Sequence, residues 1–89
     1  MYIRKEYQLQ TIAQKTFIFL FRKGEVDMTR IISFNHTAAW LWTQLYGKEF
    51  TFDEALGLLN NHYEGEAEDM KQNLQWWLDS LIKEDVIVR

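Results

Sequence analysis

The chain has 89 residues, a net charge of −3 and neither cysteine nor proline, and 47% of its residues are hydrophobic. This length allows one small domain, and the lack of cysteine excludes disulfides, thiolate metal sites and a cysteine nucleophile. The negative charge argues against a general affinity for nucleic acid or anionic membranes. The aromatic content of 16%, with four Trp, is high because the core of so small a domain is normally marginal.

No segment has the composition of a membrane anchor or a secretion signal. The longest apolar run, residues 17–21, is far shorter than the roughly 20 residues that a membrane span needs. The first ten residues lack the apolar stretch of a signal peptide. We therefore expect a cytoplasmic protein without a membrane partner.

The first 34 residues predict strands, since their apolar residues alternate or form short aromatic and β-branched runs. We expect strands over residues 7–13, 16–22 and 27–34, with a turn at residues 23–25. Such short links indicate antiparallel pairing. In the second strand, Phe17 and Phe19 alternate with Ile18, so both faces of the sheet are apolar and one face is left for a partner.

After Asn35 the apolar residues recur at helical spacing, which predicts three helices. Asn35 is a suitable N-cap for the first, and Gly47 ends it. Thr51 and Glu54 form a capping box for the second helix. A third helix follows from Ala67, and residues 86–88 form a short closing strand. The prediction is one α+β domain over residues 1–89, with strands at about 7–34 and helices at about 36–84.

Residues that could perform chemistry are few. His36 and His62 lack the spacing of a helical metal site. The paired carboxylates fit helix N-termini, and the four isolated glycines form no phosphate loop. We expect no enzymatic activity, no metal and no cofactor.

Two tryptophans fall outside the apolar stripes of their helices. At 100° per residue, Trp40 and Trp76 each lie away from the buried face. Either ring folds back over its neighbours, or the two form a contact surface for a partner, because Trp is enriched at binding hot spots. The third strand provides another contact surface, since its free edge can accept a peptide as an added strand, and Arg30 would favour an acidic one.

Three motifs between Phe34 and Ile87 resemble the PqqD family, and the resemblance spans about residues 27–89. They are the run Phe34-Asn35-His36-Thr37-Ala38-Ala39-Trp40-Leu41-Trp42 with Leu45 and Gly47; Thr51, Glu54, Ala55 and Leu56; and Leu74, Trp77, Leu78 and Leu81 with Val86 and Ile87. The resemblance implies a small winged helix-turn-helix domain, also called a RiPP recognition element. Such domains bind the leader of a ribosomally made precursor peptide and present it to a modifying enzyme, which is a radical SAM enzyme in PQQ biosynthesis.

The resemblance also implies where the peptide binds. The leader would add as a strand beside the third strand, in the cleft with the third helix. The residues implied are Met28, Thr29, Arg30, Ile31, Ile32 and Ser33 on the strand, and Met70, Lys71, Leu74 and Leu78 on the helix. Asp85 stands where the family commonly has Gly, so we expect that turn to close differently.

Two alternatives remain open. A winged helix commonly binds DNA, but the third helix begins with Glu66, Glu68 and Asp69 rather than a basic face. A homodimer could form through the second face of the sheet or through the exposed tryptophans.

Overall fold

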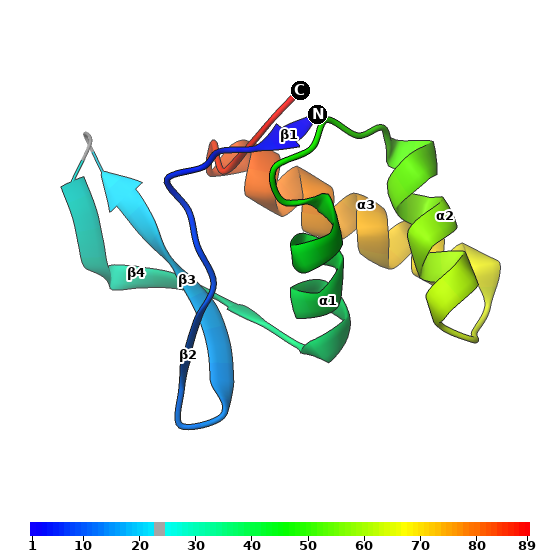
Figure 1. Ribbon diagram of the computed structural model, residues 1–89, viewed down its shortest axis with the longest axis horizontal. Helices are drawn as coiled ribbons and strands as arrows, with labels where there is room; N and C mark the ends of the chain where they lie inside the picture. The colour runs from blue at the N-terminus through cyan, green and yellow to red at the C-terminus, as the bar shows by residue number, and fades with distance from the viewer. Residues whose placement is uncertain (23–24) are drawn as a thin grey trace.

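The computed structural model describes the backbone of residues 1–22 and 25–89, and the side chains of residues 1–20 and 30–89. In chain order the elements are β1 (Tyr2–Ile3), β2 (Gln10–Ile12), β3 (Lys15–Arg22), β4 (Glu25–Phe34), α1 (His36–Leu45), α2 (Phe52–His62), α3 (Ala67–Lys83) and β5 (Ile87–Val88). The architecture is α+β, with a three-stranded antiparallel sheet of order β2-β3-β4 followed by three helices, as the sequence predicts. Figure 1 shows the sheet projecting to one side of the three helices.

The first strand of the sheet is shorter than predicted. It covers Gln10–Ile12 instead of residues 7–13, because Ala13 and Gln14 form the hairpin loop, with φ of 53° and 67°. A two-residue loop with two positive φ angles matches the twist of the strands it joins, although Gly or Asn is the usual choice. Tyr7 lies before the strand and is buried in the core.

The ladder between β3 and β4 is interrupted. Regular pairs run from Thr16 with Phe34 to Phe19 with Ile31, and the next pair joins Leu20 to Asp27. Residues 28–30 therefore have no partner on β3, which makes a bulge of three residues. Extra residues on one strand bend it, and Figure 1 shows β4 changing direction along its length. The predicted turn at residues 23–25 falls largely outside the described residues.

The predicted closing strand is present as β5, and its partner is β1, which was not predicted. Arg4 secures this pair: its backbone N–H donates to the Val86 carbonyl at 2.9 Å, and its guanidinium donates to the carbonyl of Asp85 at 2.9 Å and to its carboxylate at 3.2 Å. The hydrogen bond to the Asp85 carboxylate raises the pKa of Arg4. Asp85 has a φ of 61°, the left-handed conformation that glycine adopts without strain.

The first two helices begin where their capping residues predict. The backbone N–H of Ala38 donates to the Asn35 side chain at 2.8 Å. At α2 the Glu54 N–H donates to the Thr51 hydroxyl at 3.1 Å, and the Thr51 N–H donates to the Glu54 carboxylate at 3.2 Å, which completes the capping box. Both capping predictions are confirmed, because each cap satisfies backbone donors that the helix leaves free.

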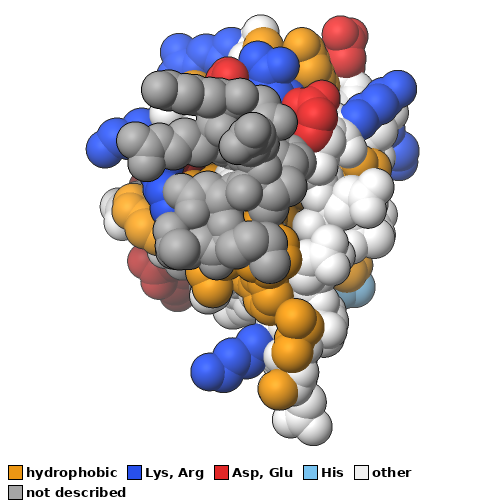
Figure 2. Space-filling model, turned by 90° about the vertical axis from the view of Figure 1, so that its left-hand side faces the viewer, with side chains coloured by type: hydrophobic (Ala, Val, Ile, Leu, Met, Phe, Trp, Pro, Cys, Tyr) orange, Lys and Arg blue, Asp and Glu red, His pale blue; other side chains and the backbone are white. Residues whose placement is uncertain are grey.

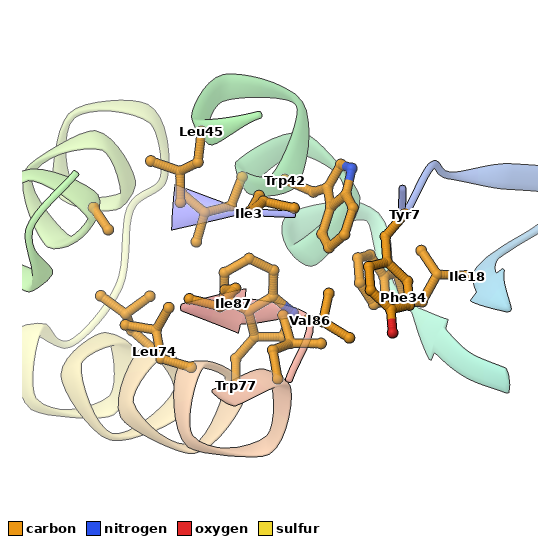
Figure 3. Packing of buried hydrophobic residues seen from close by; sticks show 14 of the residues in the cluster. Ile3, Tyr7, Ile18, Phe34, Trp42, Leu45, Leu74, Trp77, Val86 and Ile87 are labelled. Atoms are coloured by element: carbon orange, nitrogen blue, oxygen red, sulfur yellow. The ribbon is translucent and has the colours of Figure 1, made fainter. Parts of the chain in front are cut away.

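Core residues come from β1, β3, β4, the three helices and β5, whereas the three residues of β2 are exposed. Figure 3 shows Ile3 of β1 and Ile87 of β5 between Leu45 of α1 and Leu74 of α3, with Ile18 of β3 at the sheet end. None of these five side chains is more than 2% exposed. The helices thus pack around the paired β1 and β5 as well as against one face of the sheet. Within the described residues, no helix is both long and apolar enough to cross a membrane.

Candidate functional site

The open edge of β4 lies beside α3. β4 is the last strand in the order β2-β3-β4, so its second edge has no strand partner within the described sheet. Contacts between described side chains join β4 to the α3 region at both ends of residues 30–34. The rings of Phe34 and Trp77 lie 6.0 Å apart at one end, and Arg30 contacts Glu84, the C-cap of α3, at the other. β4 and α3 therefore run in opposite directions between these contacts, and we call residues 30–34 and 73–84 the β4–α3 edge.

A cavity of about 320 Å³ opens at the Phe34 end of the β4–α3 edge. It is lined by Ser33, Asn35, Thr37, Ala38, Leu41, Leu59, Asn73, Leu74, Trp76 and Trp77. None of these residues carries a charge, so the cavity suits a neutral group with apolar surface. Trp76 stands at its rim with 72% of its surface exposed.

The predicted strand residues differ in exposure. Arg30, Ile31 and Ser33 are exposed on β4, and Ile31 is 48% exposed. Ile32 is half-buried, on the same face as the core residues. The side chains of Met28 and Thr29 lie outside the described residues. Because residues 28–30 form the bulge, the regular part of the edge begins at Ile31.

The predicted helix residues divide between core and surface. Leu74 and Leu78 are 2% and 1% exposed, so both are core residues. Leu74 reaches the wall of the cavity, whereas Leu78 lines a different cavity with Met1 and Phe52. Met70 is half-buried against the core, and Lys71 is exposed. The periodic pattern placed Leu74 and Leu78 on the buried face of α3. Both side chains pack in the core and present almost no surface to a peptide.

The two singled-out tryptophans differ. Trp40 is half-buried and stacks on His62, with ring centroids 3.9 Å apart, and its ring also meets the edge of Tyr63. Its ring therefore packs between α1 and the end of α2 instead of forming a free surface. Trp76 is exposed, as its helical position predicts, and it borders the cavity. A binding role for Trp76 remains a prediction.

Sequence reasoning missed several residues of the site. Asn73 precedes Trp76 by three positions, and this helical spacing could have placed both on one side of α3. Thr37 was passed over and Asn35 was interpreted only as a cap, yet both line the cavity. Glu84 gave no signal, because its partner Arg30 is 54 positions away.

The described side chains offer no other chemistry at this edge. Among them, no three His, Asp or Glu residues gather closely enough to hold a metal ion. The indole N–H of Trp77 is buried without a hydrogen-bond partner in the described part of the chain. The edge therefore provides backbone groups, an uncharged cavity and an exposed Trp, which are features suited to binding.

This arrangement defines a class: a small α+β domain in which a ten-residue strand presents a free edge beside a 17-residue helix. Residues 22–87 match the model of the family described as coenzyme PQQ synthesis protein D (PqqD). The chain belongs to the PqqD family, which comprises accessory proteins of PQQ synthesis and not enzymes. No curated protein and no solved structure matched the chain.

Proposed function

We propose that the protein is a non-catalytic adaptor for a ribosomally made precursor peptide. It binds the leader segment by strand addition at the β4–α3 edge and presents the peptide to a modifying enzyme of the radical SAM type. Membership of the PqqD family supports this role. The observation that carries it is the free edge of β4 leading to an uncharged cavity beside Trp76.

Binding uses backbone and side chains differently. Main-chain hydrogen bonds to an added strand give affinity that does not depend on the sequence of the peptide, and pockets for alternate side chains of the peptide give specificity. The regular part of β4, residues 31–34, offers the backbone groups. The cavity accepts one apolar side chain of the peptide, and Trp76 covers it from the rim. The paired segment is short because the bulge at residues 28–30 turns the edge away.

The adaptor assists catalysis by positioning. A peptide held by its leader reaches the enzyme as an intramolecular substrate, whose effective concentration is in the millimolar range for a short flexible tether. No catalytic group on the adaptor is needed for this gain. The leader and the modified segment are separate parts of one peptide, so binding leaves the reacting residues free.

Calorimetric titration with the precursor peptide encoded beside this gene tests the proposal. We expect binding in the micromolar range, and no binding when the leader is deleted from the peptide. Amide chemical shifts should change at Ile31 and Ser33 and at the indole of Trp76, which all lie at the β4–α3 edge. No heat of binding up to millimolar peptide would refute the role.

Self-association is a second candidate, favoured by the outer face of the sheet. Ile12 is 62% and Ile31 48% exposed, and both lie on the face opposite the core residue Ile18. Figure 2 shows hydrophobic side chains at the lower end of this side of the molecule, where the β2–β3 hairpin projects. Sedimentation over a concentration range tests it: Ile12→Lys should lower the apparent mass if this face forms a dimer, and leave it unchanged if the protein is monomeric.

A further inference from the structure

The ion pair between Arg30 and Glu84 crosses from the sheet to the end of α3. The Arg30 guanidinium donates to the Glu84 carboxylate at 2.8 Å, and the two side chains are 46% and 32% exposed. Arg30 is the last residue of the bulge in β4, directly before the regular segment that begins at Ile31. The ion pair therefore stands at the point where the regular edge stops.

An added strand would meet this ion pair. A neighbouring strand lies about 4.8 Å from β4 in the plane of the sheet, and on the free edge this places it on the side that α3 borders. Past Ile31 such a strand would run into the space that the Arg30 and Glu84 side chains bridge. A peptide longer than the regular segment must turn away or displace Glu84 from Arg30.

Displacement is favoured if the peptide supplies a carboxylate. A half-exposed ion pair contributes little to stability, because water competes for both charges. A peptide Asp or Glu restores the same charge-assisted hydrogen bond to the guanidinium. Among the described side chains near this end, the Arg4 guanidinium is already paired with Asp85, and Lys83 is a second exposed cation, on α3. Arg30 is the cation that lies on β4 itself, directly beside the regular segment with which an added strand would pair.

We propose that Arg30 and Glu84 form a latch that selects an acidic residue in the bound peptide. In the free protein, the Glu84 carboxylate accepts the hydrogen bond from the Arg30 guanidinium. In the complex, an Asp or Glu directly following the strand-paired segment replaces this carboxylate. This inference rests on the proposed peptide-binding function and adds to it a fixed position for one negative charge.

Selection from a displayed library of random 12-residue peptides tests the latch. Peptides selected on the wild-type protein should carry an apolar or β-branched segment followed at constant spacing by Asp or Glu. Selection on the Arg30→Gln variant should retain the apolar segment and lose the acidic position. Lys15→Gln is the matched control, since it removes one exposed positive charge at the start of β3, at the opposite end of the paired segment from Arg30.

Affinities of one selected peptide and its Asp→Asn analogue complete the test. Arg30→Gln should weaken the acidic peptide about tenfold and leave the Asn analogue unchanged, as one charge-assisted hydrogen bond is lost. Glu84→Gln should tighten the acidic peptide several-fold by removing its competitor. Selected peptides without an acidic position, or an acidic preference that survives Arg30→Gln, would overturn the latch while peptide binding stands. Failure to select any peptide would overturn peptide binding itself.

Discussion

Trp40 stacks face to face on His62, with ring centroids 3.9 Å apart and ring planes within 9° of parallel. The contact joins the first half of α1 to the last residue of α2, and the ring of Tyr63 closes it from the side at 5.6 Å. An aromatic residue outside the main stripe of its helix thus packs against the end of the neighbouring helix.

Removing either ring of this stack should lower the free energy of unfolding, and removing both should cost less than the sum of the two single losses. We expect a double-mutant cycle of Trp40→Leu and His62→Ala to give a coupling energy of about 0.5–1.5 kcal/mol, typical of aromatic pairs. Urea unfolding of the four proteins measures it. His36→Ala is the control, because His36 is exposed at the start of α1 and takes part in no ring contact among the described residues. Additive effects of the two substitutions would show that the stack contributes nothing.

Trp76→Ala should weaken peptide binding without destabilising the fold. Trp76 is 72% exposed, so its truncation removes little buried surface, and we expect a stability change within about 0.5 kcal/mol. Truncating a Trp that covers a bound side chain typically costs at least about 2 kcal/mol of binding free energy, or roughly a 30-fold loss of affinity. Calorimetry and thermal unfolding report the two quantities. Gln72→Ala is the matched control, since Gln72 is exposed on the same helix and does not line the cavity; equal affinities of the two variants would exclude Trp76 from the site.

Leu74→Ala should act on stability first. Leu74 is 2% exposed in the core, and truncation of a buried Leu typically costs about 2–5 kcal/mol. Urea unfolding should show this loss, while Lys71→Ala, one turn earlier and exposed, should leave stability within about 0.5 kcal/mol. A Leu74→Ala protein as stable as the wild type would contradict the packing described for α3. Leu74→Asp would bury a carboxylate, so it cannot serve as a test of binding in a folded domain.

Substitutions at Asp85 should rank by their tolerance of a positive φ. Asp85→Gly and Asp85→Ala both remove the ion pair with Arg4, so their difference isolates the backbone. We expect the Ala variant to be less stable than the Gly variant by about 1 kcal/mol, because the left-handed conformation is costly for a residue with a Cβ. Chemical unfolding measures the difference. Equal stabilities would mean that the turn readjusts and that the φ of 61° is not required.

Local signals predicted most of the fold. Asn35, Thr51 and Glu54 located two helix starts because capping depends on residues within one turn. The alternation along the second predicted strand separated Ile18 from Phe17 and Phe19 for a similar reason, since side chains on a strand alternate between faces, but it did not show which face belongs to the core. These signals need no information from the rest of the chain.

Features that join distant segments were not predictable in this way. The pairing of Tyr2 with Val88 and the contact of Arg30 with Glu84 depend on the finished fold. The hairpin between the first two strands of the sheet was predicted, but its loop was placed one residue too late, since Ala13 and Gln14 are not typical turn residues. The family resemblance implied a peptide site beside β4, which stays a prediction, and it could not reveal that this strand is bent.

The bulge in β4 also bears on how this protein avoids aggregation. A ten-residue strand with a straight free edge would be a template on which copies of the chain could pair one after another. The three unpaired residues at 28–30 break that edge, leaving only residues 31–34 in regular pairing with β3 on this side of the break. An edge this short and bent can pair with a brief extended segment, but it offers too few backbone groups for copies of the chain to pair one after another.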